Sequence, residues 1–390
     1  MLRLAILTSH PIQYQAPLFR ALARRLDLEV FFAHRQSPEQ QAAAGFSTAF
    51  DWDVDLLEGY SSRFLENRAR RPGVDRFRGC DTPEIGSIIA RGRFDAVLVT
   101  GWHLLCYWQA IRACRRLRTP VLVRGDSQLV SPRSRSKRLV KAGLHRWLVR
   151  QFDGFLHVGT RNRAYLLHYG ARPERLFFTP HFVDNPWFAE RARAAAAERD
   201  AFRARLGIGA NERVILFAGR LVPFKRVEDV IRATARLAAG EVPAVRLLIA
   251  GSGPLQADLE RLAASSRAPV TFAGFRNQTE LPACYDLAEL LVLGSTGAET
   301  WGLVVNEAMA SGTPAVVSDA VGCAPDLVDG RTGQTVPVGD VPALCHAIQA
   351  TLGSKDDPAV QAALAAKMST YSVETAVAGV LAALEQVTSA

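Results

Sequence analysis

The chain has 390 residues, of which 48% are hydrophobic and 22% are charged, with 29 glycines and 20 prolines. This composition excludes a disordered, collagen-like or disulfide-rich small protein, and the length suits two domains. There is no uninterrupted apolar run of about 18 residues, and the six cysteines show neither CxxC nor zinc-site spacing. We therefore expect a reduced, cytoplasmic protein without a metal site or a membrane-spanning helix.

Positive charge is concentrated in the first half of the chain. Residues 1–190 carry 29 Arg and Lys against 17 Asp and Glu, whereas residues 191–390 carry 18 against 21. The densest run, residues 133–150, holds seven basic residues and no acidic one. Such a surface predicts peripheral contact with an anionic membrane at the inner face of the plasma membrane, or an anionic acceptor. The alternative is a solvated helix face. No nucleic-acid partner is expected, because no aromatic stacking motif accompanies the charge.

Strand-like apolar runs alternate with amphipathic segments of helical length in the first half. The predicted strands are residues 2–8, 28–32, 96–100, 120–123 and 154–158, and the predicted helices are residues 16–26, 105–117 and 137–151. This alternation is typical of a parallel sheet covered by helices on both faces. A proline-containing turn at residues 179–186 ends the series.

A second series of the same kind follows. Its predicted helix spans residues 188–206, its predicted strands span residues 214–218, 245–250, 270–272, 290–293 and 315–317, and a last helix spans residues 368–387. We expect an α/β protein of two Rossmann-like domains, residues 1–184 and 185–367, whose parallel sheets face each other across a central cleft. Residues 368–390 are treated as a separate C-terminal helix.

Two glycine-containing loops follow the first two strands of the second series. In the first, Gly219, Arg220 and Lys225 come directly after a strand. Arginine can bind phosphate oxygens in a bidentate manner, and lysine adds a point charge. Alternatively, Lys225 pairs with the acidic residues at 228 and 229. In the second loop, Gly253 and Pro254 form a tight turn that allows close backbone approach to a ligand.

The strongest motif is a pair of glutamates seven residues apart. Glu299 lies on a loop after a predicted strand, and Glu307 lies in the second turn of the helix that follows. The backbone N–H groups of Gly302, Leu303 and Val304 head this helix and form a natural phosphate cradle. Taken singly, Glu307 could simply be stabilised by the helix end and Glu299 could be an exposed loop acid.

These motifs together resemble glycosyltransferase family 4, a large group of GT-B enzymes. The resemblance covers about residues 213–339. It rests on G-R-x-x-P-F-K at 219–225, G-S-G-P at 251–254, V-x-F-x-G at 270–274, E-x7-E at 299–307 followed by E-A-M-A-S-G-x-P, and G-x-x-G-x-x-V at 330–336. It implies a nucleotide-sugar donor in the C-terminal domain and a last helix that crosses back to an acceptor-binding N-terminal domain.

The resemblance also implies roles for single residues. Arg220 and Lys225 would bind the diphosphate of the donor and stabilise its growing charge. Glu299 would contact hydroxyls of the donor sugar, and Glu307 would hold the ribose hydroxyls. The backbone near Phe275 and Arg276 would read the base.

The implied function is retaining transfer of a hexose-type sugar, without metal or other cofactor. The donor would be a UDP- or GDP-sugar and the acceptor a glycan or lipid-linked molecule in polysaccharide or glycoconjugate biosynthesis. Two alternatives stay open: a nucleotide-sugar epimerase of the same fold, or a non-catalytic subunit that binds nucleotide sugars.

The first half departs from the family pattern in two loops. Residues 9–14 stand where many relatives carry a Gly-Gly loop, and residues 124–127 stand where a pocket histidine often lies. The candidates for the missing pocket role are His10, His103 and Asp126, each at a predicted strand end. Residues 52–60 resemble a subgroup associated with bacterial surface polysaccharides. The D-x-D sequence at residues 51–53 is not expected to bind metal.

Overall fold

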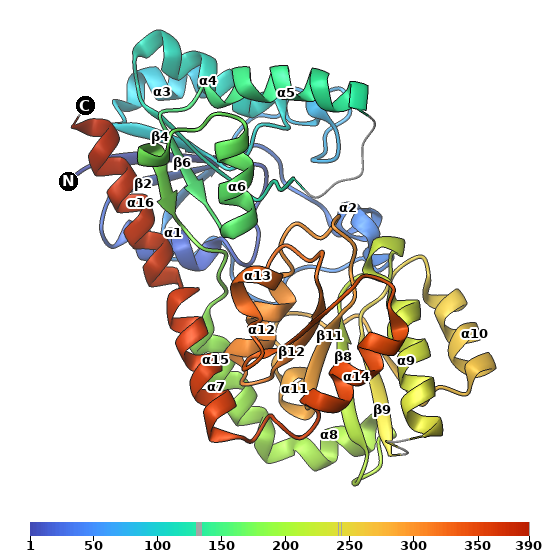
Figure 1. The fold of residues 1–390 in the computed structure, drawn as a ribbon. Helices are drawn as coiled ribbons and strands as arrows, with labels where there is room; N and C mark the ends of the chain where they lie inside the picture. The colour runs from blue at the N-terminus through green and yellow to red at the C-terminus, as the bar shows by residue number, and fades with distance from the viewer. Residues whose placement is uncertain (130–134, 241, 243, 390) are drawn as a thin grey trace. The chain divides into compact units, whose positions relative to one another are not determined.

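The computed structural model describes residues 1–129, 135–240, 242 and 244–389 (Figure 1). The chain forms two compact units. The first comprises residues 1–37, 55–181 and the C-terminal residues from 373 onward, and the second comprises residues 38–54 and 182–372. The segment 38–54 therefore belongs to the second unit, although the sequence places it between two strands of the first.

The first unit contains a seven-stranded parallel sheet in the order β3-β2-β1-β4-β5-β6-β7. Its strands are β1 Arg3–Thr8, β2 Asp27–Phe32, β3 Ser61–Phe64, β4 Ala96–Val99, β5 Val121–Gly125, β6 Gly154–His157 and β7 Leu176–Phe178. Its helices are α1 Ala16–Ala23, α3 Ile85–Gly92, α4 Leu105–Leu117, α5 Arg135–Val149, α6 Thr160–His168 and α16 Val373–Thr388. In Figure 1, α3 and α4 lie on one face of this sheet and α1 and α16 on the other.

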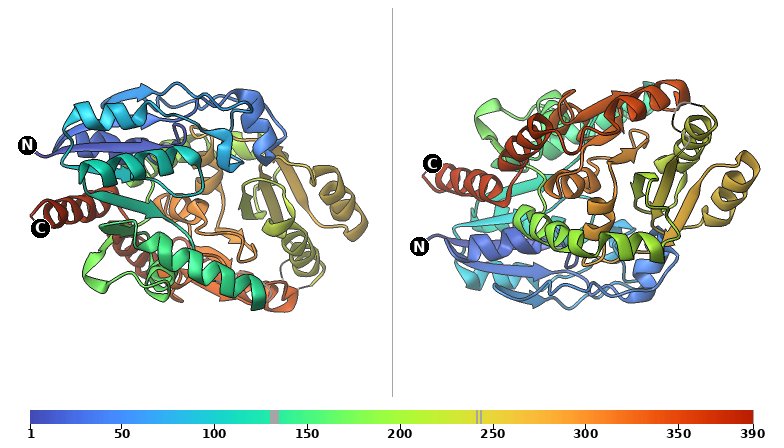
Figure 2. Two further views of the ribbon diagram at one scale, coloured as in Figure 1. Left: turned by 90° about the horizontal axis from the view of Figure 1, so that it is seen from above. Right: turned by 90° about the horizontal axis from the view of Figure 1, so that it is seen from below.

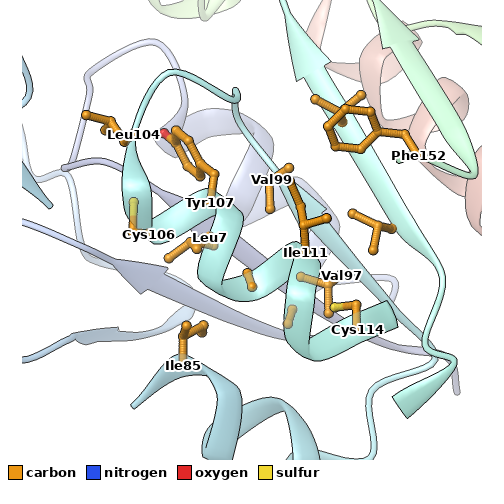
Figure 3. Packing of buried hydrophobic residues seen from close by; sticks show 14 of the residues in the cluster. Leu7, Ile85, Val97, Val99, Leu104, Cys106, Tyr107, Ile111, Cys114 and Phe152 are labelled. Atoms are coloured by element: carbon orange, nitrogen blue, oxygen red, sulfur yellow. The ribbon is translucent and has the colours of Figure 1, made fainter. Parts of the chain in front are cut away.

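The core of the first unit lies between its sheet and the helices on one face. Figure 3 shows Tyr107, Ile111 and Cys114 of α4 packed toward the strands. They meet Val97 and Val99 of β4, and every one of these side chains is buried. The central strand β4 is apolar along its whole length because helices cover both faces of a parallel sheet.

The second unit contains a six-stranded parallel sheet in the order β10-β9-β8-β11-β12-β13. Its strands are β8 Arg213–Ala218, β9 Val245–Ala250, β10 Val270–Gly274, β11 Leu290–Leu293, β12 Ala315–Ser318 and β13 Gly333–Val336. Its helices are α2 Pro38–Gln41, α7 Asn185–Ala195, α8 Arg199–Arg205, α9 Val227–Ala239, α10 Gln256–Ser266, α11 Leu281–Leu287, α12 Leu303–Ala310, α13 Ala324–Leu327, α14 Val341–Thr351 and α15 Pro358–Thr370. Figure 2 gives two further views of these helices.

The two Rossmann-like parallel sheets confirm the predicted fold class. Two helices predicted as continuous are interrupted, however. The segment 188–206 forms α7 and α8 with a 3₁₀ turn, Ala196–Glu198, between them. The predicted last helix, 368–387, breaks between α15 and α16. At this break Tyr371 is buried, its hydroxyl donates to Asp326 Oδ1 at 2.9 Å, and its backbone leaves the helical region.

Candidate functional site

The loops after β8 and β9 run in direct backbone contact. The N–H of Gly219 donates to the carbonyl of Ala250 at 3.0 Å, and that of Leu221 donates to the carbonyl of Ser252 at 2.9 Å. A Cβ atom on Gly251 would lie 1.9 Å from the carbonyl oxygen of Gly219, and one on Gly253 would lie 2.6 Å from that of Leu221. Glycine is therefore required at both positions, and the loops form a surface made mainly of backbone.

Lys225 is buried at the end of the first of these loops. It is only 7% exposed, and its ammonium group donates to a carboxylate oxygen of Glu299. The carbonyl of Phe224 accepts from the N–H of Thr296 at 2.8 Å, which ties the two loops together. Asp229, one of the alternative partners considered for Lys225, pairs with Arg226 at 2.5 Å. The structure thus brings Lys225 to Glu299, two residues that are 74 positions apart.

Glu307 lies beside this pair on α12, and it is buried. Its carboxylate accepts a hydrogen bond from the hydroxyl of Tyr285 at 2.6 Å. Burial raises the pKa of Glu307 to about 7, although the Tyr285 hydrogen bond and the charge of Lys225 both act to lower it. Lys225, Glu299 and Glu307 therefore form one electrostatically linked group.

The start of α12 is packed tightly against the sheet. Gly302 precedes the helix with φ +99°, and a Cβ there would lie 2.9 Å from Leu293 of β11. Leu303 and Val304 begin the helix and are partly exposed. The indole N–H of Trp301 donates to Asn306 Oδ1 at 2.8 Å and fixes the turn before the helix. The helix N-terminus that was predicted as a phosphate cradle is thus packed closely against β11.

Arg220 contacts a different part of the second unit. Its guanidinium Nη1 donates to the carbonyl of Ala44 at 2.5 Å, and its Cζ lies 5.8 Å from the ring centre of Phe46. Both contacts belong to the segment 38–54 of the same unit. The convergence of Arg220 and Lys225 on one diphosphate therefore stays a prediction.

The predicted base-reading residues follow β10. The ring of Phe275 packs on Phe50, with centroids 4.3 Å apart, and on Phe46, with centroids 5.7 Å apart. Arg276 pairs with Glu280 at 2.8 Å. Sequence reasoning did not single out Phe46 or Phe50, although two phenylalanines four residues apart are a visible signal.

The first unit holds a separate cavity of about 270 Å³ at the carboxyl ends of its central strands. His10, His103 and Asp126 all line it, so the structure brings these three candidates together. Residues that the sequence reasoning did not propose also line it: Tyr14, Tyr107, Arg124 and His181.

The imidazoles of this cavity are neutral at pH 7. Burial lowers the pKa of His10 to about 4, with a smaller contribution from His34. Burial also lowers the pKa of His103 and, far more strongly, that of His181. Arg124 is buried, and its guanidinium Nη2 donates to the carbonyl of Pro180 at 2.9 Å. The cavity is thus lined by neutral hydrogen-bonding rings, one guanidinium and one carboxylate.

In the part of the chain that the structure describes, no three His, Cys, Asp or Glu side chains are grouped so as to hold a metal ion. Within the D-x-D sequence, the carboxylate of Asp53 accepts from the backbone N–H of Thr279 at 3.1 Å. The carbonyl of Asp51 accepts from the side-chain amide of Asn277 at 2.7 Å.

Replacing Glu307 by Gln should change how the stability of the protein depends on pH. The unfolded chain ionises this carboxyl near pH 4.5, whereas the folded protein keeps its proton until about pH 7. The free energy of unfolding of the wild-type protein therefore falls as the pH rises from about 4.5 through about 7, because the buried carboxyl loses its proton. Glutamine does not ionise, so the variant shows no such fall. Relative to wild type, Glu307→Gln should gain up to about 3 kcal/mol between pH 5 and pH 8 in urea unfolding.

The matched control for this measurement is Glu260→Gln, because Glu260 is exposed on α10. Its stability relative to wild type should be the same at both pH values. A difference between Glu307→Gln and wild type that is constant from pH 5 to pH 8 would contradict the raised pKa.

Comparison with known proteins finds relatives for both the sequence and the fold. Residues 198–370 match the family described as glycosyl transferases group 1. The D-inositol 3-phosphate glycosyltransferase of Mycobacterium bovis (strain BCG / Pasteur 1173P2) is 40% identical over 176 residues, which are 43% of this chain and 34% of that protein. The chain thus matches about a third of the length of this curated relative.

Two solved structures match the chain over nearly its whole length. HepE of Anabaena, in complex with UDP and glucose, has a TM-score of 0.72 at 17% identity, covering 99% of this chain and 100% of that one. The α,α-trehalose 6-phosphate synthase of Burkholderia multivorans has a TM-score of 0.74 at 17% identity, covering 100% and 99%. Residues 198–370 thus match the group 1 glycosyl transferases in sequence, as the resemblance to glycosyltransferase family 4 predicts, and the whole chain shares the GT-B fold of these solved structures.

Proposed function

We propose that the protein is a retaining, metal-independent glycosyltransferase. It moves a hexose-type sugar from a UDP- or GDP-sugar to a glycan or lipid-linked acceptor in polysaccharide or glycoconjugate biosynthesis. The observation that carries this proposal is the ion pair of buried Lys225 and partly buried Glu299, beside the buried carboxyl of Glu307. A cation and two acids held together at the end of one sheet suit a ligand that carries both phosphates and hydroxyl groups.

The diphosphate of the donor lies between the cations and the start of α12 in this proposal. Lys225, Arg220 and the N–H groups of Leu303 and Val304 stabilise the negative charge that grows on the leaving nucleotide as the glycosidic bond breaks. Gly253 and its loop allow the phosphates to approach the backbone closely. These groups act on charge that is larger in the transition state than in the ground state, so they accelerate the reaction.

The two acids bind hydroxyl groups on either side of the diphosphate. Glu299 contacts the donor sugar, and the hydrogen bond from Lys225 holds its carboxylate in place. Glu307 holds the ribose, where a carboxyl with a pKa of about 7 can either accept or donate a hydrogen bond near neutral pH. The backbone near Phe275 and Arg276 reads the base. The sugar passes through an oxocarbenium-like state and keeps its anomeric configuration by attack from the face of the leaving group.

The cavity of the first unit receives the acceptor in this proposal. Its volume of about 270 Å³ is comparable to that of one sugar residue, and its lining offers hydroxyl, imidazole and carboxylate partners for sugar hydroxyls. Asp126 is the only carboxylate among the lining residues, so it is the group that accepts the proton or hydrogen bond of the attacking hydroxyl. His10, kept neutral by burial, can either donate to or accept from the same acceptor.

Contact with a membrane rests on α5. This helix begins at Arg135 within the basic run, and it exposes two apolar side chains, Leu144 at 58% and Trp147 at 49%. Trp147 stacks on Trp108 with centroids 5.3 Å apart. Residue 133 of the basic run lies outside the described residues. Among the described residues, no helix is long and apolar enough to cross a membrane. An interfacial helix that combines arginines with exposed Trp and Leu suits anionic lipid headgroups.

Lys225→Ala should nearly abolish turnover of the donor. Release of free nucleotide from a panel of UDP- and GDP-sugars is measured with and without glycan acceptors, beginning with UDP-sugars because HepE was solved with UDP. The variant should lower kcat by about 100-fold or more, because a cation aimed at the leaving group is lost. The matched control is Lys367→Ala, whose side chain pairs with Asp329 in the same unit and should leave kcat unchanged.

Three results would contradict transferase function. Equal rates for Lys225→Ala and wild type exclude the proposed role of the pair. Conversion of the donor into an isomeric nucleotide sugar without acceptor indicates the epimerase. Tight donor binding without turnover for every donor and acceptor indicates the non-catalytic subunit.

Asp126→Asn should separate transfer from hydrolysis. Transfer to the acceptor should fall by about 100-fold, because the amide cannot take the proton of the attacking hydroxyl. Slow hydrolysis of the donor by water should stay within about twofold of wild type, since the donor residues belong to the other unit. Asp75→Asn, an exposed change in the first unit, is the control. Equal loss of both reactions would contradict an acceptor role for Asp126.

Charge reversal at Arg135, Arg138 and Arg146 should abolish binding to vesicles that contain phosphatidylglycerol. Each basic residue near an anionic surface contributes about 1 kcal/mol, and wild-type binding should weaken as NaCl is raised from about 0.05 to 0.5 M. The control reverses three exposed arginines of the second unit: Arg193, Arg205 and Arg331. Unchanged co-sedimentation of the α5 variant would exclude this surface.

A further inference from the structure

Residues 38–54, here named the strap, cover the ends of three strands of the second unit. The strap comprises α2 (drawn in blue in Figure 1), a π-helical turn at Ala42–Phe46 and an extended tail. It contacts the loops that follow β8, β9 and β10, through Arg220, Ser252 and Asn277 respectively. The same three loops were assigned to the diphosphate and the base of the donor.

Two carbonyl oxygens of the strap occupy hydrogen-bond donors of these loops. The carbonyl of Ala44 accepts from the guanidinium of Arg220 at 2.5 Å, and the carbonyl of Phe46 accepts from the hydroxyl of Ser252. The hydroxyl of Thr48 donates to the same Ser252 oxygen at 3.3 Å. The strap thus presents acceptor oxygens where the proposed diphosphate would present its own.

Aromatic rings hold the strap on the loop after β10. Phe50 is buried, and its ring lies 4.3 Å from that of Phe275 and 5.1 Å from that of Phe46. Trp52 packs edge-on against Phe50 at 5.0 Å. Four rings therefore form one cluster beside the backbone that was assigned to the base.

The two parts of the strap are held unequally. The tail is anchored, because Asp53 accepts from Thr279 N at 3.1 Å and Asp51 accepts from Asn277 at 2.7 Å. The turn is weaker: it buries no side chain, and Ser47, which is not a glycine, has φ +56°. Segments with few buried contacts and a strained backbone open at the lowest free energy.

We propose that the strap competes with the donor: the turn 42–47 occupies Arg220 and Ser252 in the free protein, and a nucleoside diphosphate displaces it while residues 50–53 stay anchored. This inference rests on the proposed function, because it takes Arg220 and the glycine loops as the diphosphate site. The exchange is favourable because a guanidinium binds phosphate oxygens more strongly than a neutral carbonyl. The donor can bind only when the turn is displaced, and the free energy that this costs lowers the apparent affinity for the donor. Phe46 and Gly45, which stabilise the turn, therefore help to set that affinity.

Hydrogen exchange of the full chain tests the displacement. Saturating UDP, and GDP in a parallel series, should speed the exchange of amides 42–48 and leave amides 50–53 unchanged. Slower or unchanged exchange at 42–48, with nucleotide bound, would overturn the proposal and leave the proposed function intact.

Variants that loosen the turn should bind nucleotide more tightly. Phe46→Ala removes ring contacts to Phe50 and Phe275, and the Kd for UDP or GDP in calorimetry should fall by about two- to tenfold. Gly45→Ala is a second variant that spares the ring cluster: φ +107° is strained for alanine, and its Cβ would meet Arg220 at 3.4 Å. It should shift Kd in the same direction. Phe77→Ala, an exposed phenylalanine of the first unit, is the matched control.

The other possible results of the affinity measurements also support or overturn the strap proposal. Weaker nucleotide binding by Phe46→Ala and Gly45→Ala would show that the strap is a wall of the donor site, and wild-type affinity in both would show that it is a bystander; either overturns the proposal. Nucleotide binding by Phe46→Ala alone, with none by wild type, would support a strap that blocks the site. Binding by neither would overturn both the strap proposal and the proposed donor.

Discussion

The chemistry of the second unit depends on a buried lysine that keeps a carboxylate partner. A charge removed from water loses several kcal/mol of hydration unless another charge and further hydrogen bonds compensate. Lys225 meets this requirement through Glu299, and its positive charge also acts on Glu307. A ligand that binds to one of these three side chains therefore also affects the electrostatic environment of the other two.

Glycines around this group allow close packing of the backbone. Gly251 and Gly253 let two loops lie in contact, because a Cβ at either position would clash with the backbone of the other loop. Gly302 does the same for the start of α12 against β11. Glycines at these points place N–H groups, rather than side chains, beside Lys225 and the two acids. A polar backbone surface next to a buried ion pair is well suited to phosphate, which combines charge with many acceptor oxygens.

The candidate sites of the two units differ in the charge of the side chains that form them. In the second, charged residues are buried as a linked set, whereas in the first, burial holds three histidines neutral around one guanidinium and one carboxylate. Neutral rings that both donate and accept suit hydroxyl groups, and linked charges suit a diphosphate. The family match covers residues 198–370, which lie in the second unit. The cavity of the first unit lies outside this matched segment.

The strand pattern and the spaced motifs were enough to predict two parallel α/β units, the glycine loops and the Glu299–Glu307 pair. Those features are local, because buried parallel strands are apolar runs and each motif lies within a few residues of a strand end. Only the tertiary structure decided that Lys225 pairs with Glu299 rather than with the acid at 229, and that the strap carries Phe46 to Arg220. These contacts join residues far apart in the chain. Their geometry follows from how loops from different strands pack, which no pattern within one segment encodes.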